Sequence, residues 1–207
     1  MTSGDQYDRS VFINCPFDDE YRPLFRAAVF VVYYCGYLPR CAVEVDDSGA
    51  TRFGRIIELI RGSCFGLHDL SRVESTDGLP RFNMPFELGL FLGCKCAGGP
   101  RQRRKVALVL DSVPHRFKQS LSDIAGQDSR SHGGEPKELI QQVRNWLFNQ
   151  TAQDLPGGLH VWHHYTRFQA EVPALLAATR KSVADLDNFL DYSRLVYDWV
   201  TANTAPI

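Results

Sequence analysis

The sequence predicts an α/β fold, in which a doubly wound parallel sheet carries a helical C-terminal extension. Apolar runs of strand length alternate with longer segments of helical periodicity from residue 10 to residue 111, as they do in βα units. The apolar runs are nearly continuous, which is typical of strands that are buried on both faces. With 207 residues, of which 44% are hydrophobic, the chain is long enough for one α/β domain with an appendage.

Prolines and glycines mark the ends of the expected strands and helices. Strands are expected over residues 10–14, 41–45, 63–70 and 105–111, and helices over residues 21–35 and 53–60 and from residue 85 onward. Pro16 and the acidic residues that follow it end the first strand. Gly36 and Gly62 stand where helix C-terminal caps belong. Pro85 is placed at the first position of the third helix, where its missing N–H costs nothing.

The last third of the chain is less regular. Residues 120–136 are polar and contain glycine, which predicts a long loop, and a helix is expected around residues 139–147. His160–His163 is interpreted as an edge strand, and residues 186–200 as a C-terminal helix with an apolar stripe. We find no linker, so residues 10–150 are expected to form the α/β domain, with residues 151–207 packed on it as an extension.

Composition and charge exclude several classes of protein. The 23 basic and 24 acidic residues leave a net charge of -1, which argues against a protein that binds nucleic acid through bulk electrostatics. No apolar segment reaches membrane-spanning length, and the first residues lack the features of a signal peptide. The six cysteines mostly lie in apolar segments, as free thiols do in reducing compartments. We therefore expect a cytoplasmic protein with neither a membrane nor a nucleic acid as its direct partner.

No metal site is expected. Cys94 and Cys96 lack the CxxC spacing of a structural zinc site. Four histidines have no carboxylate or thiol at ligand spacing, so surface or edge-strand positions are expected for them: His132, His160, His163 and His164.

The fold class itself predicts where a ligand would bind. In an open α/β sheet, ligands bind outside the carboxyl ends of the strands, where the strand order reverses. If the first strand is central, the loops over residues 14–20 and 71–83 meet there. Neither GxxxxGK[ST] nor a GxGxxG after a strand is present, which argues against a P-loop NTPase and a Rossmann dehydrogenase.

Three segments in order carry a resemblance to a known group. They are VFINCPFD at residues 11–18, HDLSR at residues 68–72 and NMPFELG at residues 83–89. Together they resemble the Toll/interleukin-1 receptor (TIR)-like group, which shares a superfamily with the nucleoside 2-deoxyribosyltransferases. The resemblance covers about residues 10–150, although the loop between Arg72 and Asn83 is longer and more charged than the compact connection of the group.

The resemblance implies a flavodoxin-like fold, nucleotide binding by residues 10–150, and N-glycosidic chemistry. The helix-start glutamate is the catalytic residue of the group, and Glu87 matches it. Bacterial relatives cleave the nicotinamide–ribose bond of NAD, some cyclise the product, and many serve in anti-phage defence.

The position of Glu87 in the expected helix suits a catalytic role independently of the resemblance. With Pro85 in first position, Glu87 falls in the first helical turn, where the helix dipole favours an ionised carboxylate. Breaking a C1′–N bond builds positive charge on the ribose, which a fixed carboxylate can stabilise or attack. The alternative is that Glu87 only caps backbone N–H groups.

Two residues flank the loop after the first strand, and each has two interpretations. Asn14 could bind phosphate or ribose, and Phe17 could stack on a base. Alternatively, Asn14 caps a turn and Phe17 fills the core.

Four residues surround the loop after the third strand. Asp69 either orients the site or holds the amides of the loop, and Ser71 is expected to line the same cleft. Arg72 either meets a phosphate or lies on the surface. Asn83 begins the third matched segment and completes the expected substrate-binding set.

The leading hypothesis is a TIR-like NAD glycohydrolase or ADP-ribosyl cyclase, with NAD as substrate and no cofactor. Such an enzyme is expected to act as a homo-oligomer or with an activating partner protein. NAD needs a second nucleotide pocket, for which the loops over residues 71–83 and 112–136 are candidates. One alternative is a nucleoside or nucleotide N-glycosidase or deoxyribosyltransferase. Another is a non-catalytic TIR-like module for nucleotide sensing or protein interaction.

Overall fold

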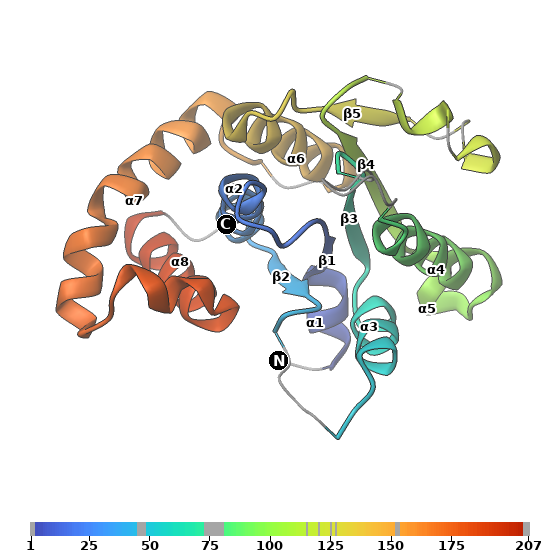
Figure 1. Ribbon diagram of the computed structural model, residues 1–207, viewed down its shortest axis with the longest axis horizontal. Helices are drawn as coiled ribbons and strands as arrows, with labels where there is room; N and C mark the ends of the chain where they lie inside the picture. The colour runs from blue at the N-terminus through green and yellow to red at the C-terminus, as the bar shows by residue number, and fades with distance from the viewer. Residues whose placement is uncertain are drawn as a thin grey trace.

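A five-stranded, all-parallel sheet forms the centre of the molecule (Figure 1). The computed structural model describes residues 3–44, 49–72, 81–114, 116–119, 121–124, 126, 128–151 and 154–204. The strands are β1 (Ser10–Asn14), β2 (Leu38–Cys41), β3 (Phe65–Asp69), β4 (Val106–Asp111) and β5 (Ser129–Ser131). Their order is β2-β1-β3-β4-β5, which is that of flavodoxin-like folds. β1 is an inner strand, as expected, although β3 and not β1 occupies the middle.

Helices cover both faces of the sheet, which confirms the doubly wound architecture (Figure 1). On one face lie α2 (Arg22–Tyr34) and α6 (Pro136–Gln150), and on the other lie α3 (Arg52–Arg61) and α4 (Asn83–Ala97). Alternate side chains of β1 serve the two faces: Val11 and Ile13 join the core with α2 and α6, and Phe12 packs with α3 and α4. The shorter elements are α1 (Ser3–Arg9), α5 (Pro100–Arg103), η1 (Arg116–Gln119) and η2 (Ser122–Ile124).

The C-terminal segment packs on α2 and shares its core. It consists of α7 (Gly158–Thr179), η3 (Val183–Asp187) and α8 (Phe189–Asn203), which lie beyond α2 as seen from the sheet (Figure 1). Phe30 of α2 contacts four rings at centroid distances of 5.1 to 5.9 Å, those of Tyr34, Tyr165, Phe168 and Trp199. The continuous apolar run of α2 is therefore covered by the sheet on one side and by the extension on the other.

The second strand lies earlier in the chain than predicted, at Leu38–Cys41 rather than at residues 41–45. The strand is at the edge of the sheet, where Pro39 is tolerated although it donates no hydrogen bond. The Glu44 carboxylate then accepts hydrogen bonds from Arg40 Nε and the Cys41 N–H, so the chain turns where the strand was expected to continue. Residue 45 of the predicted strand lies outside the described residues.

The prediction of an edge strand at His160–His163 was wrong, because these residues belong to α7. Val161, Tyr165 and Phe168 face the core at helical spacing, a period that a four-residue window does not reveal. The edge strand beyond β4 is β5, which lies in the segment expected to be a loop and pairs with β4 through Ser129–Ser131.

The third helix begins two residues earlier than predicted, at Asn83. The Phe86 N–H already bonds to the Phe82 carbonyl, and Pro85 takes the third helical position, where no N–H is needed. Glu87 therefore lies in the second turn of α4 and not in the first.

Candidate functional site

The strand order reverses between β1 and β3, because the chain continues outward to β2 on one side and to β4 on the other. Asn14, the last residue of β1, lies in register with His68 of β3, and Asp69 ends β3 one residue later. The loops after β1 and β3 thus leave from adjacent strand ends, as the sequence predicts. This is the position where ligands bind in open α/β sheets.

Asn14 connects the end of β1 to the start of α4. Its side chain is buried, and Nδ2 donates to the Met84 carbonyl at 2.8 Å and faces Nδ1 of His68 at 3.0 Å. Burial lowers the pKa of His68 to about 3, so the imidazole is neutral and its Nδ1 accepts this bond. The amide of Asn14 thus positions the helix that carries Glu87, a role that neither sequence interpretation of Asn14 included.

Asp69 is fully buried and holds three groups. Its carboxylate accepts hydrogen bonds from the Tyr21 hydroxyl at 2.5 Å and the Ser71 N–H at 2.8 Å, and it lies 2.9 Å from Nε2 of His132. Burial alone would raise the pKa of Asp69, but His132 and the two hydrogen bonds outweigh it and lower the pKa. An ionised Asp69 therefore holds the loop after β3, in agreement with one of its two interpretations.

His132 is buried beside Asp69, which corrects the expectation of a surface or edge-strand position. It follows β5, whose pairing with β4 places it near the end of β3. No local pattern signals this, since the contact depends on the arrangement of the strands.

Ser71 is nearly buried, and the loop around it is held from a second side. Arg116 of η1 donates to the carbonyls of Leu70 and Ser71 and forms an ion pair of 2.7 Å with the buried Asp111. No motif or spacing in the sequence indicates this role of Arg116. The first residues after β3 are thus fixed by Asp69 through an N–H and by Arg116 through carbonyls.

Arg72 pairs with carboxylates of the loop after β1. Its guanidinium lies 3.4 Å from Asp18 and bonds to Glu20, and Asp18 also binds Arg81 at 2.6 Å. These pairs join the two switch-point loops. Arg72 could bind a phosphate only if it gave up its pairs with Asp18 and Glu20.

Glu87 combines burial with a scarcity of partners. The residue is only 8% exposed. Within the described part of the chain, no hydrogen bond or ion pair reaches its carboxylate. Burial raises the pKa of Glu87 to about 7, and the positive charge of Arg52 opposes this rise. The alternative that Glu87 caps backbone N–H groups is not supported by a hydrogen bond among the described residues. Asn83, the first residue of α4, is exposed.

Cys15 follows β1, where the charges of both carboxylates act on it. It is buried, and burial together with the charges of Asp69 and Glu87 raises its pKa well above the ordinary value. The thiol therefore stays protonated, which does not suit a nucleophile. It serves as an apolar spacer at the end of β1.

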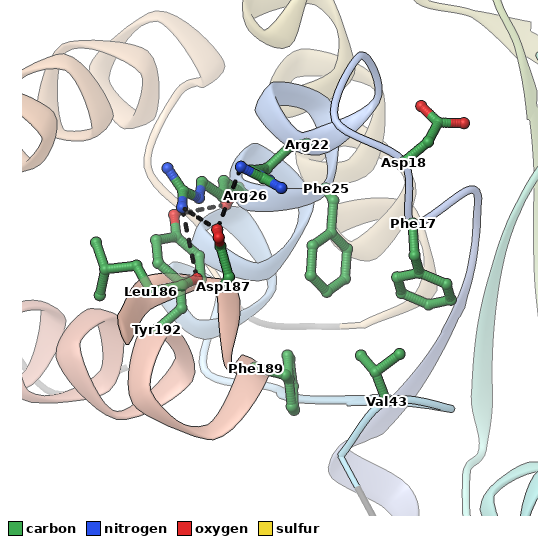
Figure 2. Close-up of a pocket in the computed structure, with 10 residues that line it drawn as sticks. All are labelled: Phe17, Asp18, Arg22, Phe25, Arg26, Val43, Leu186, Asp187, Phe189 and Tyr192. Atoms are coloured by element: carbon green, nitrogen blue, oxygen red, sulfur yellow. Dashed lines mark hydrogen bonds and ion pairs between the residues drawn. The ribbon is translucent and has the colours of Figure 1, made fainter. Parts of the chain in front are cut away.

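Phe17 neither fills the core nor joins the buried cluster at the strand ends. It is 40% exposed and meets Phe25 edge-on at 5.3 Å. It lines a pocket that the loop after β1 shares with η3 and α8 (Figure 2). The structure thus gathers Asn14, Asp69 and Ser71 around the ends of β1 and β3, and Phe17 faces the C-terminal extension.

No model of a known protein family, no curated protein and no solved structure matches this chain. In the part of the chain that the structure describes, no three His, Cys, Asp or Glu side chains gather as a metal site requires. None of the described helices is both long and apolar enough to cross a membrane.

Proposed function

We propose that this chain cleaves the N-glycosidic bond of NAD or a related nucleotide, with Glu87 as the catalytic carboxylate. One observation carries the proposal: Glu87 is buried beside the switch point with a pKa of about 7 and no cation in direct contact among the described residues. A strongly perturbed carboxyl near a predicted ligand site is typical of catalytic groups.

The chemistry follows from the charge that Glu87 supplies. When the C1′–N bond of NAD breaks, its electron pair goes to the nicotinamide nitrogen, which leaves as a neutral ring. The positive charge moves to the ribose, where an ionised carboxylate in a poorly solvated site stabilises it. Water then adds to C1′ and releases a proton to solvent. This chemistry requires Glu87 to be ionised.

The residues around Glu87 support this assignment as positioning residues. Asn14 holds the first turn of α4 through the Met84 carbonyl, and Asp69 holds the start of the loop after β3 through the Ser71 N–H. Ser71 and Asn83 remain our proposals for groups that contact the ribose. A role in antiviral defence follows from the resemblance to the TIR-like group alone.

The test is to incubate the protein with NAD and to separate the products by mass. We expect nicotinamide together with linear or cyclic ADP-ribose. Glu87→Gln should reduce turnover about a hundredfold or more, as the loss of one electrostatic partner in a dry site does. The matched control is Glu138→Gln, which removes an exposed carboxylate from the start of α6.

Two results would contradict this proposal. Full turnover by a well-folded Glu87→Gln protein would end the catalytic role, and a non-catalytic nucleotide-binding module would then be the better account. A wild-type protein that ignores NAD but cleaves nucleosides would favour an N-glycosidase or deoxyribosyltransferase.

A further inference from the structure

A pocket of about 150 Å³ lies where the C-terminal extension meets the carboxyl end of the sheet (Figure 2). The loop after β1 and the first turns of α2 form one wall, and η3 and the start of α8 form the other. Figure 2 shows two chemically different ends. Phe17, Phe25, Val43 and Phe189 gather at one end, with Asp18 next to Phe17. The other three charged side chains gather at the other end: Arg22, Arg26 and Asp187.

The apolar end is built from aromatic rings. Phe25 lies between Phe17 and Phe189, with centroid distances of 5.3 and 6.0 Å. Phe17 and Val43 are each about two-fifths exposed, so this end is open to a ligand. An apolar cavity of about 150 Å³ holds one benzene-sized ring. The pocket thus encloses one planar ring, and the sugar and phosphate of a ligand would lie outside this volume, along the partly exposed side chains of Arg22 and Arg26.

The polar end has two guanidinium groups that share one carboxylate. Oδ1 of Asp187 lies 3.2 Å from Arg22 and 3.6 Å from Arg26, and Arg22 also pairs with the exposed Asp19. Arg26 is further held by the ring of Tyr192, 5.4 Å from its guanidinium carbon. Each guanidinium offers five N–H donors in a planar fork, which suits phosphate oxygens. Arg22 also begins α2, so the positive end of the helix dipole lies at this side.

We propose that this pocket binds a mononucleotide, with the heteroaromatic base between Phe17, Val43 and Phe189 and the phosphate at Arg22 and Arg26. Such a ligand would contact the α/β domain and the extension at once. The proposal goes beyond the cleavage proposed above and does not depend on Glu87, which is not among the residues that line the pocket.

Calorimetric titration of the full chain tests this proposal, with Glu87→Gln as the background so that no nucleotide is consumed. The probes are AMP, nicotinamide mononucleotide, adenosine and inorganic phosphate. We expect one mononucleotide per chain, and binding of adenosine or phosphate alone at least about tenfold weaker. A comparison of AMP with nicotinamide mononucleotide shows which base the aromatic end prefers.

Variants of the two ends separate their contributions. Val43→Trp fills the apolar end from an exposed position and should abolish binding. Arg26→Gln should weaken mononucleotide binding about tenfold or more. Asp187→Asn should tighten it, because Arg26 then has no competing carboxylate among the described residues and Arg22 keeps only its pair with Asp19. The control is Asp198→Asn, which breaks the exposed pair with Arg194 elsewhere in the extension and should change nothing.

Three results would overturn the proposal: no mononucleotide binding, equal affinity for adenosine and AMP, or binding that Val43→Trp and Asp187→Asn leave unchanged. Asp187 is exposed, so its variant tests the proposal even if Val43→Trp disturbs folding. Mononucleotide binding by a protein that never cleaves NAD would support this pocket and contradict only the proposed catalysis.

Discussion

Glu87→Gln is expected to stabilise the fold above pH 7 and to leave its stability almost unchanged in acid. Burial raises the pKa of Glu87 from 4.5 to about 7, so between these values the folded state holds the proton more tightly than the unfolded state. Ionisation therefore removes stability as the pH rises through this window. At 1.36 kcal/mol per pKa unit, the cost reaches about 3 kcal/mol above pH 7. Gln carries no charge and avoids this cost.

Thermal melting of both proteins from pH 4.5 to pH 8 measures the difference. A domain of this size shifts its Tm by about 2–4 °C per kcal/mol, so the variant should melt up to about 6–12 °C higher at pH 8 and at nearly the same temperature at pH 4.5. Glu138→Gln, at an exposed position, controls for the substitution itself. A difference in Tm that is the same at every pH would refute the reasoning, because it would show that the Glu87 carboxyl does not titrate as a buried group.

Three further predictions concern the pH dependence of NAD cleavage and the packing around β3. NAD cleavage should rise as the pH passes about 7, because only the ionised form of Glu87 stabilises the ribose cation; a flat pH–rate profile would contradict this. Tyr21→Phe removes the hydroxyl bonded to Asp69 and should cost about 1–3 kcal/mol in a denaturant melt, whereas an unchanged midpoint would show that the bond adds nothing. Gly66→Ala would place a Cβ 2.5 Å from Nε2 of His68 and 2.7 Å from the ring of Phe91, so a loss of about 1–3 kcal/mol is expected; a variant as stable as wild type would mean that these rings move aside freely.

The sheet could be predicted from the sequence because its inner strands are short, continuous apolar runs separated by helical periodicity. β5 could not, because Ser129–Ser131 is three polar residues at an edge, and its pairing depends on β4 being in place. The misassigned segment at His160–His163 shows the opposite problem. A few residues read alone look like a strand, although Val161 and Tyr165 belong to a helical stripe that continues well beyond them.

For the site, the sequence could predict which residues stand at the strand ends but not what they touch. Asn14 and Asp69 are predictable as site residues because they stand at the ends of apolar runs that form β1 and β3. Asp69 has two side-chain partners, Tyr21 just before α2 and His132 just after β5. No spacing in the sequence connects these residues with Asp69. The pKa of Glu87 likewise depends on burial that only the packed structure provides.

The position of α2 has a consequence for how the molecule unfolds. Because Phe30 and its neighbours are packed by the sheet and by α7 and α8 at once, removal of either layer would expose the apolar run of residues 27–32. The extension and the sheet should therefore open as one cooperative unit, with the slowest amide hydrogen exchange in α2. A chain shortened to residue 150 would leave that helix face bare and prone to self-association.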